Sequence, residues 1–432
     1  MLLWGQGVTD LKQVAGGGLL ERRAFLLSGI GLSLAGFANT SAAQALPVVA
    51  PAYDMPAWMR MPGGADLAYG LPAAQEQVLR QQHAGPPEDS GFAVWRTPLA
   101  SQPGVITPSG LHFAVHHNGI PDIDPQQHRL MIHGLVERPL SFDLEQLARY
   151  PLVSQIRFIE CSGNTAANAA SPWARDESCQ QLFGEISGSE WAGVPLKLLL
   201  REAGIKPSAK WVIAEGADGG SHSRSVPLEK LLDDAIVALY QNGERLRPSQ
   251  GYPMRLLLPG WEGNVNVKWL HRLEVCDAPA YTKDESGLYS EVLANGEIER
   301  FSFFMDVKSV ITHPSGQQIL PEAHGYYEIA GLAWSGYGRI TRVEVSADGG
   351  LSWADAHLHG PVLDKALTRF SIPWHWDGRS SVLLSRATDE FGRVQPTRAH
   401  WKRRYAAHSF NHYNAQQAWR VARDGRVENV YV

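Results

Sequence analysis

The sequence predicts an α+β domain over residues 106–290, followed by an all-β, immunoglobulin-like sandwich domain over residues 300–405. In the first region, apolar runs with strand-like alternation are interleaved with short segments of helical spacing. In the second region the helical segments stop, and short alternating runs follow one another across turns. The chain also contains 42 glycines and 27 prolines without a repeating period, which favours loop-rich structure over a helical bundle.

The first domain shows its expected elements in order. Patterning begins near "GLHFAVHHNGIP", and "HRLMIHGLV" predicts a strand before a short helix in "SFDLEQLARY", with Ser141 as the helix N-cap. "VPLKLLLREAGI" has apolar residues at helical spacing and predicts a helix that ends at Gly204. "KWVIAEGADG" predicts a strand and a turn, and "LEKLLDDAIVALYQNGERL" a helix or a helix–strand pair that ends at Asn242 and Gly243. "YPMRLLLPGWEGNVNVKWLHRLEV" predicts two strands.

The second domain consists of short runs that predict strands. They are "SVITHPSGQQI", "YYEIAGLAWSG", "ITRVEVSADGG", "SWADAHL", "TRFSIPWHW", "SSVLLSRATDEFGR" and "RAHW". Residues 46–105, rich in Pro, Gly and Gln, predict an extended arm ahead of the first domain. Residues 406–432 form a tail, and its aromatic residues predict that it docks on another part of the protein.

Residues 1–45 predict an export signal. Arg22 and Arg23 precede an apolar run that ends in small residues at Ala43 and Ala45, the pattern of a twin-arginine signal. The apolar run is shorter than the ~20 residues of a membrane span, so we expect a cleaved peptide and a periplasmic protein that is exported folded. An ordinary secretory signal and a short anchor are the alternatives.

Composition and missing motifs exclude several functions. The formal net charge of −5 argues against nucleic-acid binding, which needs a basic face. The sequence contains no P-loop, no Gly-rich dinucleotide fingerprint and no GxSxG elbow. Since CxxCH is also missing, we expect no haem in this chain.

The stretch "RFIECSGNTAANAA" carries the first candidate for chemistry, Cys161. It is one of three cysteines, an odd number that leaves at least one thiol unpaired, although a bridge between Cys161 and Cys179 is an alternative. A cysteine nucleophile needs a base and an orienting group, and the neighbouring sequence supplies no such pair. Ligation of a soft metal fits better, because only small and polar residues follow before Pro172 and Trp173.

The histidines near the start of the first domain are the second candidate. On a helix, His112 and His116 would share one face and could bind zinc. Phe113 and Val115 favour an extended segment instead. Hydrogen bonding to a polar ligand or a structural role is therefore the preferred interpretation of these histidines, and zinc is the alternative.

Three motifs in order resemble the sulfite oxidase family of molybdopterin enzymes: the "ECSGN" loop, "GYPMRLLLPGWEGNVNVKWLHRLEV" and "VEVSADGGLSWADA". The resemblance covers about residues 100–405. It implies a sulfite-oxidase-type molybdopterin-binding domain over residues 106–290 and a homodimer formed through the sandwich domain. It also implies a molybdenum–molybdopterin cofactor, with Cys161 as the protein ligand of the metal.

The resemblance also assigns site residues one by one. Cys161 and His116 would be catalytic, and Arg255 and Lys268 would hold the cofactor's phosphate, as a buried anion requires cations. The implied cofactor-binding residues are His116, His117, Asn118, Cys161, Ser162, Gly163, Asn164, Asp218, Arg255, Asn266, Val267 and Lys268.

The sequence departs from the family's pattern at several positions. His116 stands where the family has an arginine, Thr165 where the cysteine loop continues with an arginine, and Gln250 where it has a histidine. The family's tyrosine aligns with Leu239, with Tyr240 one step away. Less positive charge disfavours capture of a small dianion such as sulfite. The arginines nearest the motifs are Arg157, Arg175 and Arg224.

One branch of the family shows these departures, the molybdenum subunit of sulfane dehydrogenases, which shares "ECSGN", "AVHHNGIPDID" and an "NAQQAW…DG…NVY" tail. This resemblance implies a sulfane substrate on a cysteine of a sulfur-carrier protein, in thiosulfate oxidation. It further implies electron transfer to a c-type cytochrome subunit in a heterotetramer. The tail histidines His408 and His412 are expected to pack. The alternatives are a periplasmic sulfite dehydrogenase and a cofactor-free exported binding protein.

Overall fold

The computed structural model describes residues 13–22, 67–83, 91–321 and 324–432, together with the single positions 56, 59, 62 and 65. The chain separates into two compact units, and one of them contains residues 12–22 and 79–432, with all the sheets discussed below. Residues 23–45, which hold most of the predicted export signal, lie outside the described residues. Within the described part, no helix has the length and apolar character needed to cross a membrane.

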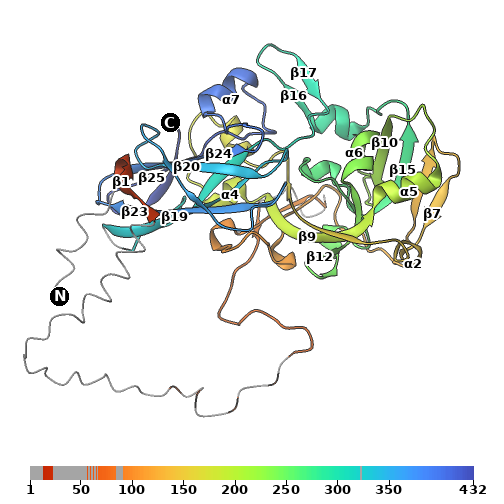
Figure 1. Ribbon diagram of the computed structural model, residues 1–432, viewed down its shortest axis with the longest axis horizontal. Helices are drawn as coiled ribbons and strands as arrows, with labels where there is room; N and C mark the ends of the chain where they lie inside the picture. Colours follow the sequence, from red (N-terminus) through yellow and green to blue (C-terminus); the bar gives the residue numbers. More distant parts are fainter. Residues whose placement is uncertain are drawn as a thin grey trace, which may run out of the picture. The chain divides into compact units, whose positions relative to one another are not determined.

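The α+β domain contains a five-stranded sheet in the order β11-β10-β15-β6-β7 (Figure 1). The pair β15–β6 is parallel, and the other pairs are antiparallel. The bounds of these strands are β6 Leu130–Gly134, β7 Leu140–Phe142, β10 Trp211–Gly216, β11 Ser223–Pro227 and β15 Leu270–Cys276. Helices α2 (Leu144–Leu147), α5 (Leu196–Ala203) and α6 (Leu228–Asp233) belong to the same domain.

A second sheet of this domain has the order β13-β12-β9-β8, with β14 paired to β12. Its strands are β8 Val153–Glu160, β9 Ile186–Pro195, β12 Ile236–Gln241, β13 Glu244–Arg245 and β14 Arg255–Leu257. A small third sheet joins β3 (Gln81–Gln82), β4 (Ala93–Arg96) and β5 (Ala114–His116). Strand β4 lies within the residues that the sequence assigned to an extended arm, and it pairs with β5, so it brings this segment to the edge of the domain.

Local sequence signals explain two helix ends, one as predicted and one not. Helix α5 ends before Gly204, whose φ of 74° is the left-handed conformation that glycine adopts most easily. The predicted N-cap Ser141 of α2 is wrong, because Ser141 lies in strand β7. Asp143 caps α2 instead, since its side chain accepts a hydrogen bond from the Gln146 backbone N–H while Gln146 returns one, a capping box.

The C-terminal region is a sandwich of two antiparallel sheets, as the alternating runs predicted. One sheet has the order β1-β2-β23-β19-β18 with β22 beside β23, and the other β21-β20-β24-β25-β26. The sandwich strands are β18 Lys308–His313, β19 Gly325–Trp334, β20 Ile340–Ser346, β21 Ala354–Asp355, β22 His357–Leu358, β23 Thr368–Trp376 and β24 Ser381–Asp389. The tail contributes β25 (Ala418–Val421) and β26 (Val427–Val430), so its docking on the sandwich is confirmed.

Two further segments differ from the sequence-based expectation. "RAHW" is not a strand but the start of helix α7 (Arg398–Arg404), because the Thr397 hydroxyl accepts a hydrogen bond from the His400 N–H as an N-cap. Near the other end of the chain, β1 (Gln13–Ala15) and β2 (Leu19–Leu20) add to the sandwich sheet at β23. A hairpin of β16 (Ser290–Val292) and β17 (Ile298–Arg300) links the two domains along the chain.

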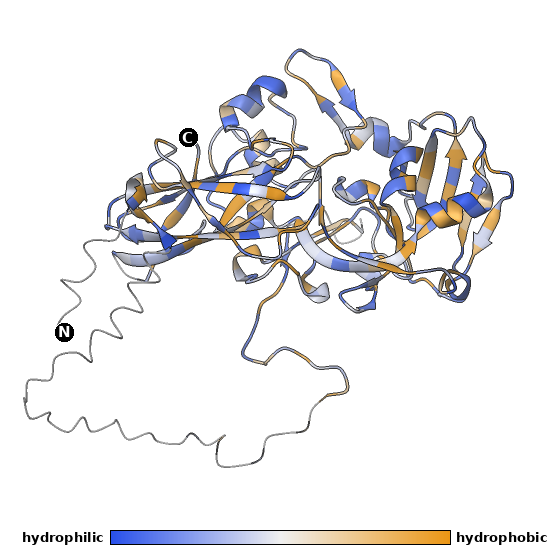
Figure 2. Ribbon diagram, viewed as in Figure 1, coloured by the Kyte–Doolittle hydropathy of each residue, from blue (hydrophilic) through white to orange (hydrophobic). Residues whose placement is uncertain are grey.

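Two large apolar cores hold these sheets together, and Figure 2 shows bands of hydrophobic residues between hydrophilic ones along the strands of both domains. One core fills the α+β domain. The other fills the sandwich, and it includes Phe158 of β8 and Ile186 of β9. The long β8–β9 pair therefore belongs to both domains, and its end, where Cys161 follows Glu160, lies at their junction.

Candidate active site

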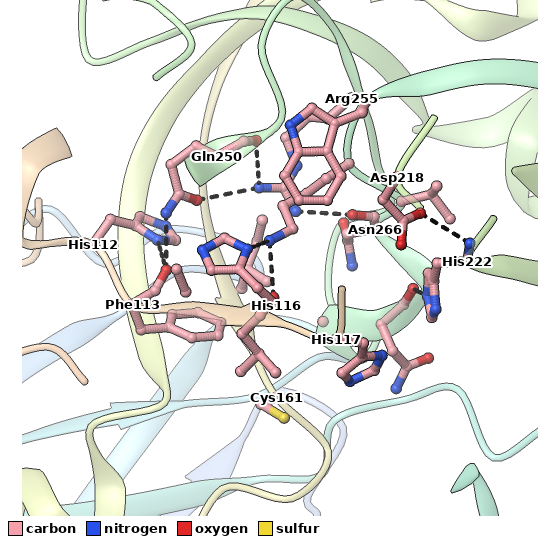
Figure 3. Close-up of a pocket in the computed structure, with 18 of the residues that line it drawn as sticks. His112, Phe113, His116, His117, Cys161, Asp218, His222, Gln250, Arg255 and Asn266 are labelled. Carbon is pink, nitrogen blue, oxygen red and sulfur yellow. Dashed lines mark hydrogen bonds between the residues drawn. The ribbon is translucent and has the colours of Figure 1, made fainter. Parts of the chain in front are cut away.

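An open cavity lies in the α+β domain, and polar, charged and aromatic side chains line it (Figure 3). Segments far apart in the chain line it: β5, the end of β8, the β10–β11 loop, residues 250–269 and Tyr289. Among the residues implied by sequence, the structure gathers in its wall His116, His117, Cys161, Asp218, Arg255, Asn266, Val267 and Lys268.

One end of the cavity is cationic. Arg255 donates hydrogen bonds to the carbonyls of Gln250 (3.1 Å) and Asn266 (2.9 Å), and Lys268 donates to the carbonyl of Val115 (2.8 Å). In the described part of the chain, neither cation forms an ion pair, and the Nε of Arg255 is buried without a hydrogen-bond partner. Burial lowers the pKa of Arg255 to about 9, and burial together with Arg255 holds the pKa of Lys268 well below its usual value. Arg255 and Lys268 are therefore suited to bind an anionic group at this end of the cavity.

The histidines of this wall are neutral donors and acceptors. Burial lowers the pKa of His112 to about 3, and burial and Lys268 lower that of His116 to about 2. The Lys268 ammonium donates to Nδ1 of His116 (2.8 Å), so its Nε2 carries the proton and has no hydrogen-bond partner. His112 donates from Nδ1 to the carbonyl of Phe113 (2.9 Å), which leaves its Nε2 as an unpartnered acceptor. Both rings therefore keep one nitrogen free for a ligand.

The other end of the cavity carries the Cys161 sulfur (Figure 3), and buried polar contacts shape its loop. The Glu160 carboxylate accepts hydrogen bonds from Asn164 Nδ2 (2.9 Å) and from the indole of Trp334 (2.6 Å). It also forms a buried ion pair with Lys308 of β18 (2.9 Å). The Lys308 ammonium donates in addition to the hydroxyl of Thr165 (2.8 Å), whose backbone has a φ of 77°. Glu160 and Asn164 of the "EC…N" pattern thus fix the loop on either side of Cys161 and do not line the cavity themselves.

The C-terminal tail holds the next residue of the loop. The Ser162 hydroxyl donates to Oδ1 of Asn411 (3.0 Å), and the carbonyl of Ser162 accepts from the His412 backbone N–H (2.8 Å). Asn264 donates to the same hydroxyl (3.3 Å). Ser162 and Asn164 therefore position the loop from behind. His412 is buried and packs, as expected, with its ring 3.4 Å from Glu262.

Cys161 is a thiol that the protein itself does not ionise. Burial, and next the nearby charge of Glu185, raise its pKa, although the Gly163 backbone N–H donates to the sulfur. In the described residues all three cysteines are free, so the alternative bridge between Cys161 and Cys179 is not present. Ionisation of this thiol therefore requires an added positive charge, which a coordinated metal ion provides.

A second polar group lies between the two ends. The Asp218 carboxylate accepts hydrogen bonds from Asn118 (3.3 Å) and from the His222 backbone N–H (3.0 Å), so Asn118 orients Asp218 and does not line the cavity itself. His117, His222 and Asp284 bring three ligand-type atoms within 4.8 Å of one another. The alternative zinc pair, His112 and His116, does not belong to this group, and no third ligand-type side chain among the described residues joins that pair.

Sequence reasoning missed the aromatic and charged wall beside the sulfur. Neither position considered for the family's tyrosine lines the cavity, since Leu239 is buried in the core and Tyr240 lies under Arg245. The phenol that lines the cavity is Tyr289, whose ring is covered by the Arg224 guanidinium at 4.5 Å. Tyr289 follows a single π-helical turn, Asp284–Leu288, which carries no sequence signature that we could have used.

The charges around this wall are paired. Arg224 is fully buried and forms ion pairs with Glu262 (3.1 Å) and Glu285 (2.9 Å). His412 contacts the second oxygen of Glu262, and His222 lies 3.4 Å from Asp284. Of the other two arginines that we considered, Arg157 pairs with Asp364 and Arg175 is exposed. Near the Cys161 sulfur, the carboxylates of Glu262 and Glu285 therefore offset the charge of the Arg224 guanidinium.

Two family models match the chain in succession. Residues 117–283 match the oxidoreductase molybdopterin binding domain, and residues 300–415 match the Mo-co oxidoreductase dimerisation domain. The first model covers most of the residues that line the cavity, and the second covers most of the sandwich strands, whereas the lining residues 112–116 and Tyr289 lie outside both models.

Curated relatives share part of their length with the chain. The NADH nitrate reductase of Solanum lycopersicum is 32% identical over 345 residues, which cover 69% of this chain and 37% of that protein. The mitochondrial sulfite oxidase of Mus musculus is 30% identical over 320 residues, 68% of this chain and 58% of that protein. Among solved structures, that of the sulfane dehydrogenase SoxCD from Paracoccus pantotrophus matches with a TM-score of 0.85 and 43% identity, and the match covers 88% of this chain and 98% of that one.

Proposed function

Because this chain belongs to the sulfite oxidase family of molybdopterin oxidoreductases, we propose that it oxidises the sulfane sulfur of a cysteine adduct on a carrier protein. The sequence is similar to a sulfane dehydrogenase over nearly the whole length of that solved chain. Electrons would leave to a c-type cytochrome subunit, and the enzyme would work in the periplasm.

The residues of the cavity fit the family's cofactor. Two cations without an ion-pair partner, Arg255 and Lys268, stand at one end and suit the phosphate of a pterin. The unpartnered Nε2 atoms of His112 and His116 suit a polar ring beside them. The Cys161 sulfur stands at the other end, in a loop fixed from behind. When bound, the molybdenum centre supplies two-electron oxygen-atom transfer.

The residues of this chain bind and orient the cofactor. Arg255 and Lys268 would bind and orient the phosphate end, and the Nε2–H of His116, which has no partner among the described residues, would donate to a polar atom of the bound group. The contacts behind the loop hold the Cys161 sulfur in one direction, as a metal ligand requires. Each oxygen atom that is added to the substrate sulfur comes from water and releases two electrons and two protons.

The charges near the Cys161 sulfur are the observation that favours a carrier-bound sulfane over free sulfite as the substrate. Glu262 and Glu285 neutralise Arg224, which lies behind Tyr289, and the lysine and arginine that line the cavity, Lys268 and Arg255, lie at the phosphate end. A free sulfite dianion would enter this wall without a compensating charge, which is unfavourable in a site shielded from water. A persulfide-type sulfur at the end of a peptide arm carries less charge and gains binding energy from the arm. This distribution of charge supports the carrier-bound substrate over free sulfite.

A direct comparison of substrates tests the proposal. The molybdenum-loaded protein, with a c-type cytochrome as acceptor, is offered a carrier peptide with a persulfide on its cysteine, the same peptide with a free thiol, and free sulfite. We expect rapid cytochrome reduction with the persulfide peptide and little with the other two. If sulfite reduces the cytochrome with an equal or larger kcat/KM, the enzyme is a sulfite dehydrogenase and the charge argument is wrong.

A further inference from the structure

The segment Gln13–Leu20, which lies inside the predicted export signal and ahead of its arginine pair, is built into the folded sandwich. Leu19 pairs with Trp374 of the edge strand β23, and Leu19 and Leu20 are 0% and 3% exposed. The indole of Trp374 donates a hydrogen bond to the carbonyl of Gly17 (2.7 Å). The Gly16 N–H donates to the hydroxyl of Ser352 (2.7 Å). Apolar burial of Leu19 and Leu20 and hydrogen bonds to Gly16 and Gly17 thus hold this segment on the sandwich.

Two of the three glycines of this segment, Gly17 and Gly18, are required by the closeness of the contact. A Cβ on Gly17 would lie 2.5 Å from the carbonyl oxygen of Ala347, and one on Gly18 would lie 2.0 Å from that of His375. Both residues also have positive φ, 71° and 92°, which disfavours any side chain. Since both clashes involve backbone atoms, they cannot be relieved by moving a side chain. The "GGGLL" pattern is therefore specific to this groove.

The groove exists only on a completed sandwich. One wall is the end of β20 and its turn, which carry Ala347, Asp348 and Ser352, and the other is β23 with Trp374 and His375. Strands β20 and β23 belong to different sheets, so the two walls meet only after both sheets have packed. Occupation of the groove therefore depends on the folded C-terminal domain.

We propose that Gln13–Leu20, here called the clasp, is an intramolecular strand that docks on the completed sandwich and holds the start of the export signal against it. Arg22, the first residue of the arginine pair, follows the clasp by two positions. The clasp pairs with β23 at Trp374, beyond residues 370–371 that pair with β22, so it also covers a part of the sheet edge that would otherwise be open to other strands. When the clasp is docked, the start of the export signal lies against the C-terminal domain. The signal can therefore take this position only after the domain farthest from it in sequence has folded.

Limited trypsin digestion of the full chain tests the clasp. Cleavage near Arg22 and Arg23 separates a fragment that contains residues 13–22 from the body. We expect the fragment to co-elute with the body in gel filtration and to be released only by denaturant. In Gly17→Val and Leu19→Asp the fragment should elute alone, while the body keeps its circular dichroism spectrum. Gly104→Val is the matched control, because no atom lies within 4 Å of a Cβ at that position.

Hydrogen exchange gives an independent measurement on the uncut chain. The amide of Gly16 should exchange about tenfold or more slowly than a free peptide amide, and Ser352→Ala should remove this protection because it removes the acceptor. Two results would overturn the proposal: a wild-type fragment that elutes alone, or a Gly17→Val fragment that is retained as well as the wild-type one.

Discussion

Replacing Lys308 by methionine tests whether the C-terminal domain fixes the cysteine loop. The Lys308 side chain is 2% exposed, and its ammonium contacts Glu160 at 2.9 Å and the Thr165 hydroxyl at 2.8 Å. Methionine has nearly the same length but no charge, so the substitution leaves the Glu160 carboxylate buried without its cation. The Trp334 indole and the Asn164 amide remain as its donors.

The expected loss of stability follows from this burial. Removal of one partner of a buried ion pair costs about 3–5 kcal/mol, since the remaining charge stays buried and uncompensated. Replacing both partners by neutral groups is far less costly. Lys308→Met should therefore destabilise the protein by about that amount, and the double variant Lys308→Met with Glu160→Gln should recover much of the loss.

Urea unfolding of the wild type and the variants measures the loss of stability in the single variant and its recovery in the double variant. The dependence of the unfolding free energy on urea concentration should be the same in all of them. Arg379→Met is the control, because Arg379 forms an exposed pair with Asp377 and its loss should leave the midpoint unchanged. Labelling of the Cys161 thiol in the metal-free protein should be faster in Lys308→Met, as the loop loses its support. Equal destabilisation of the single and double variants would refute this reasoning, because the uncompensated charge would then not be the cause.

Three further predictions concern the site. Cys161→Ser should lower the molybdenum content per chain or, where metal is retained, shift its spectrum, whereas Cys276→Ser should change neither. Lys268→Met and Arg255→Gln should each reduce the pterin content of purified protein measured by fluorescence, with a larger loss in the double variant. Burial lowers the pKa of His412, but Glu262 outweighs it and raises the pKa above 6.5. The stabilisation by His412 is thus complete below about pH 6.5 and declines as pH rises through the folded pKa, so His412→Gln should cost more stability at pH 6 than at pH 8.

The sequence was informative where a short pattern determines a local structure. Gly204 ends α5 because a left-handed position follows the apolar repeat. The alternating runs after residue 300 became sandwich strands, since a period of two buries one face of a sheet. Cys161 lines the cavity, in agreement with the expectation that its sulfur is available as a ligand, whereas the small and polar residues that follow it do not line the cavity.

Prediction failed where the partner of a residue lies far away in sequence. Tyr289 follows a π-helical turn, and its contacts with His222 and Arg224, which lie far earlier in the chain, give the direction of its ring. Leu19 reads as part of an export signal, yet its place in the core depends on pairing with Trp374. "RAHW" alternates like a strand, and the cap at Thr397 decides for a helix. In each case the local pattern is ambiguous, and tertiary contacts select one conformation.

The contacts behind Cys161 explain why the sandwich belongs to the active site rather than serving dimerisation alone. Lys308 comes from the first strand of the sandwich, and Asn411 and His412 come from the tail. All three fix residues 160–165, although none of them lines the cavity. A cofactor that needs a correctly directed thiol can therefore bind well only after the C-terminal domain has folded. The clasp docks on that same domain, so a chain that has formed it has also completed the support on which the cysteine loop depends.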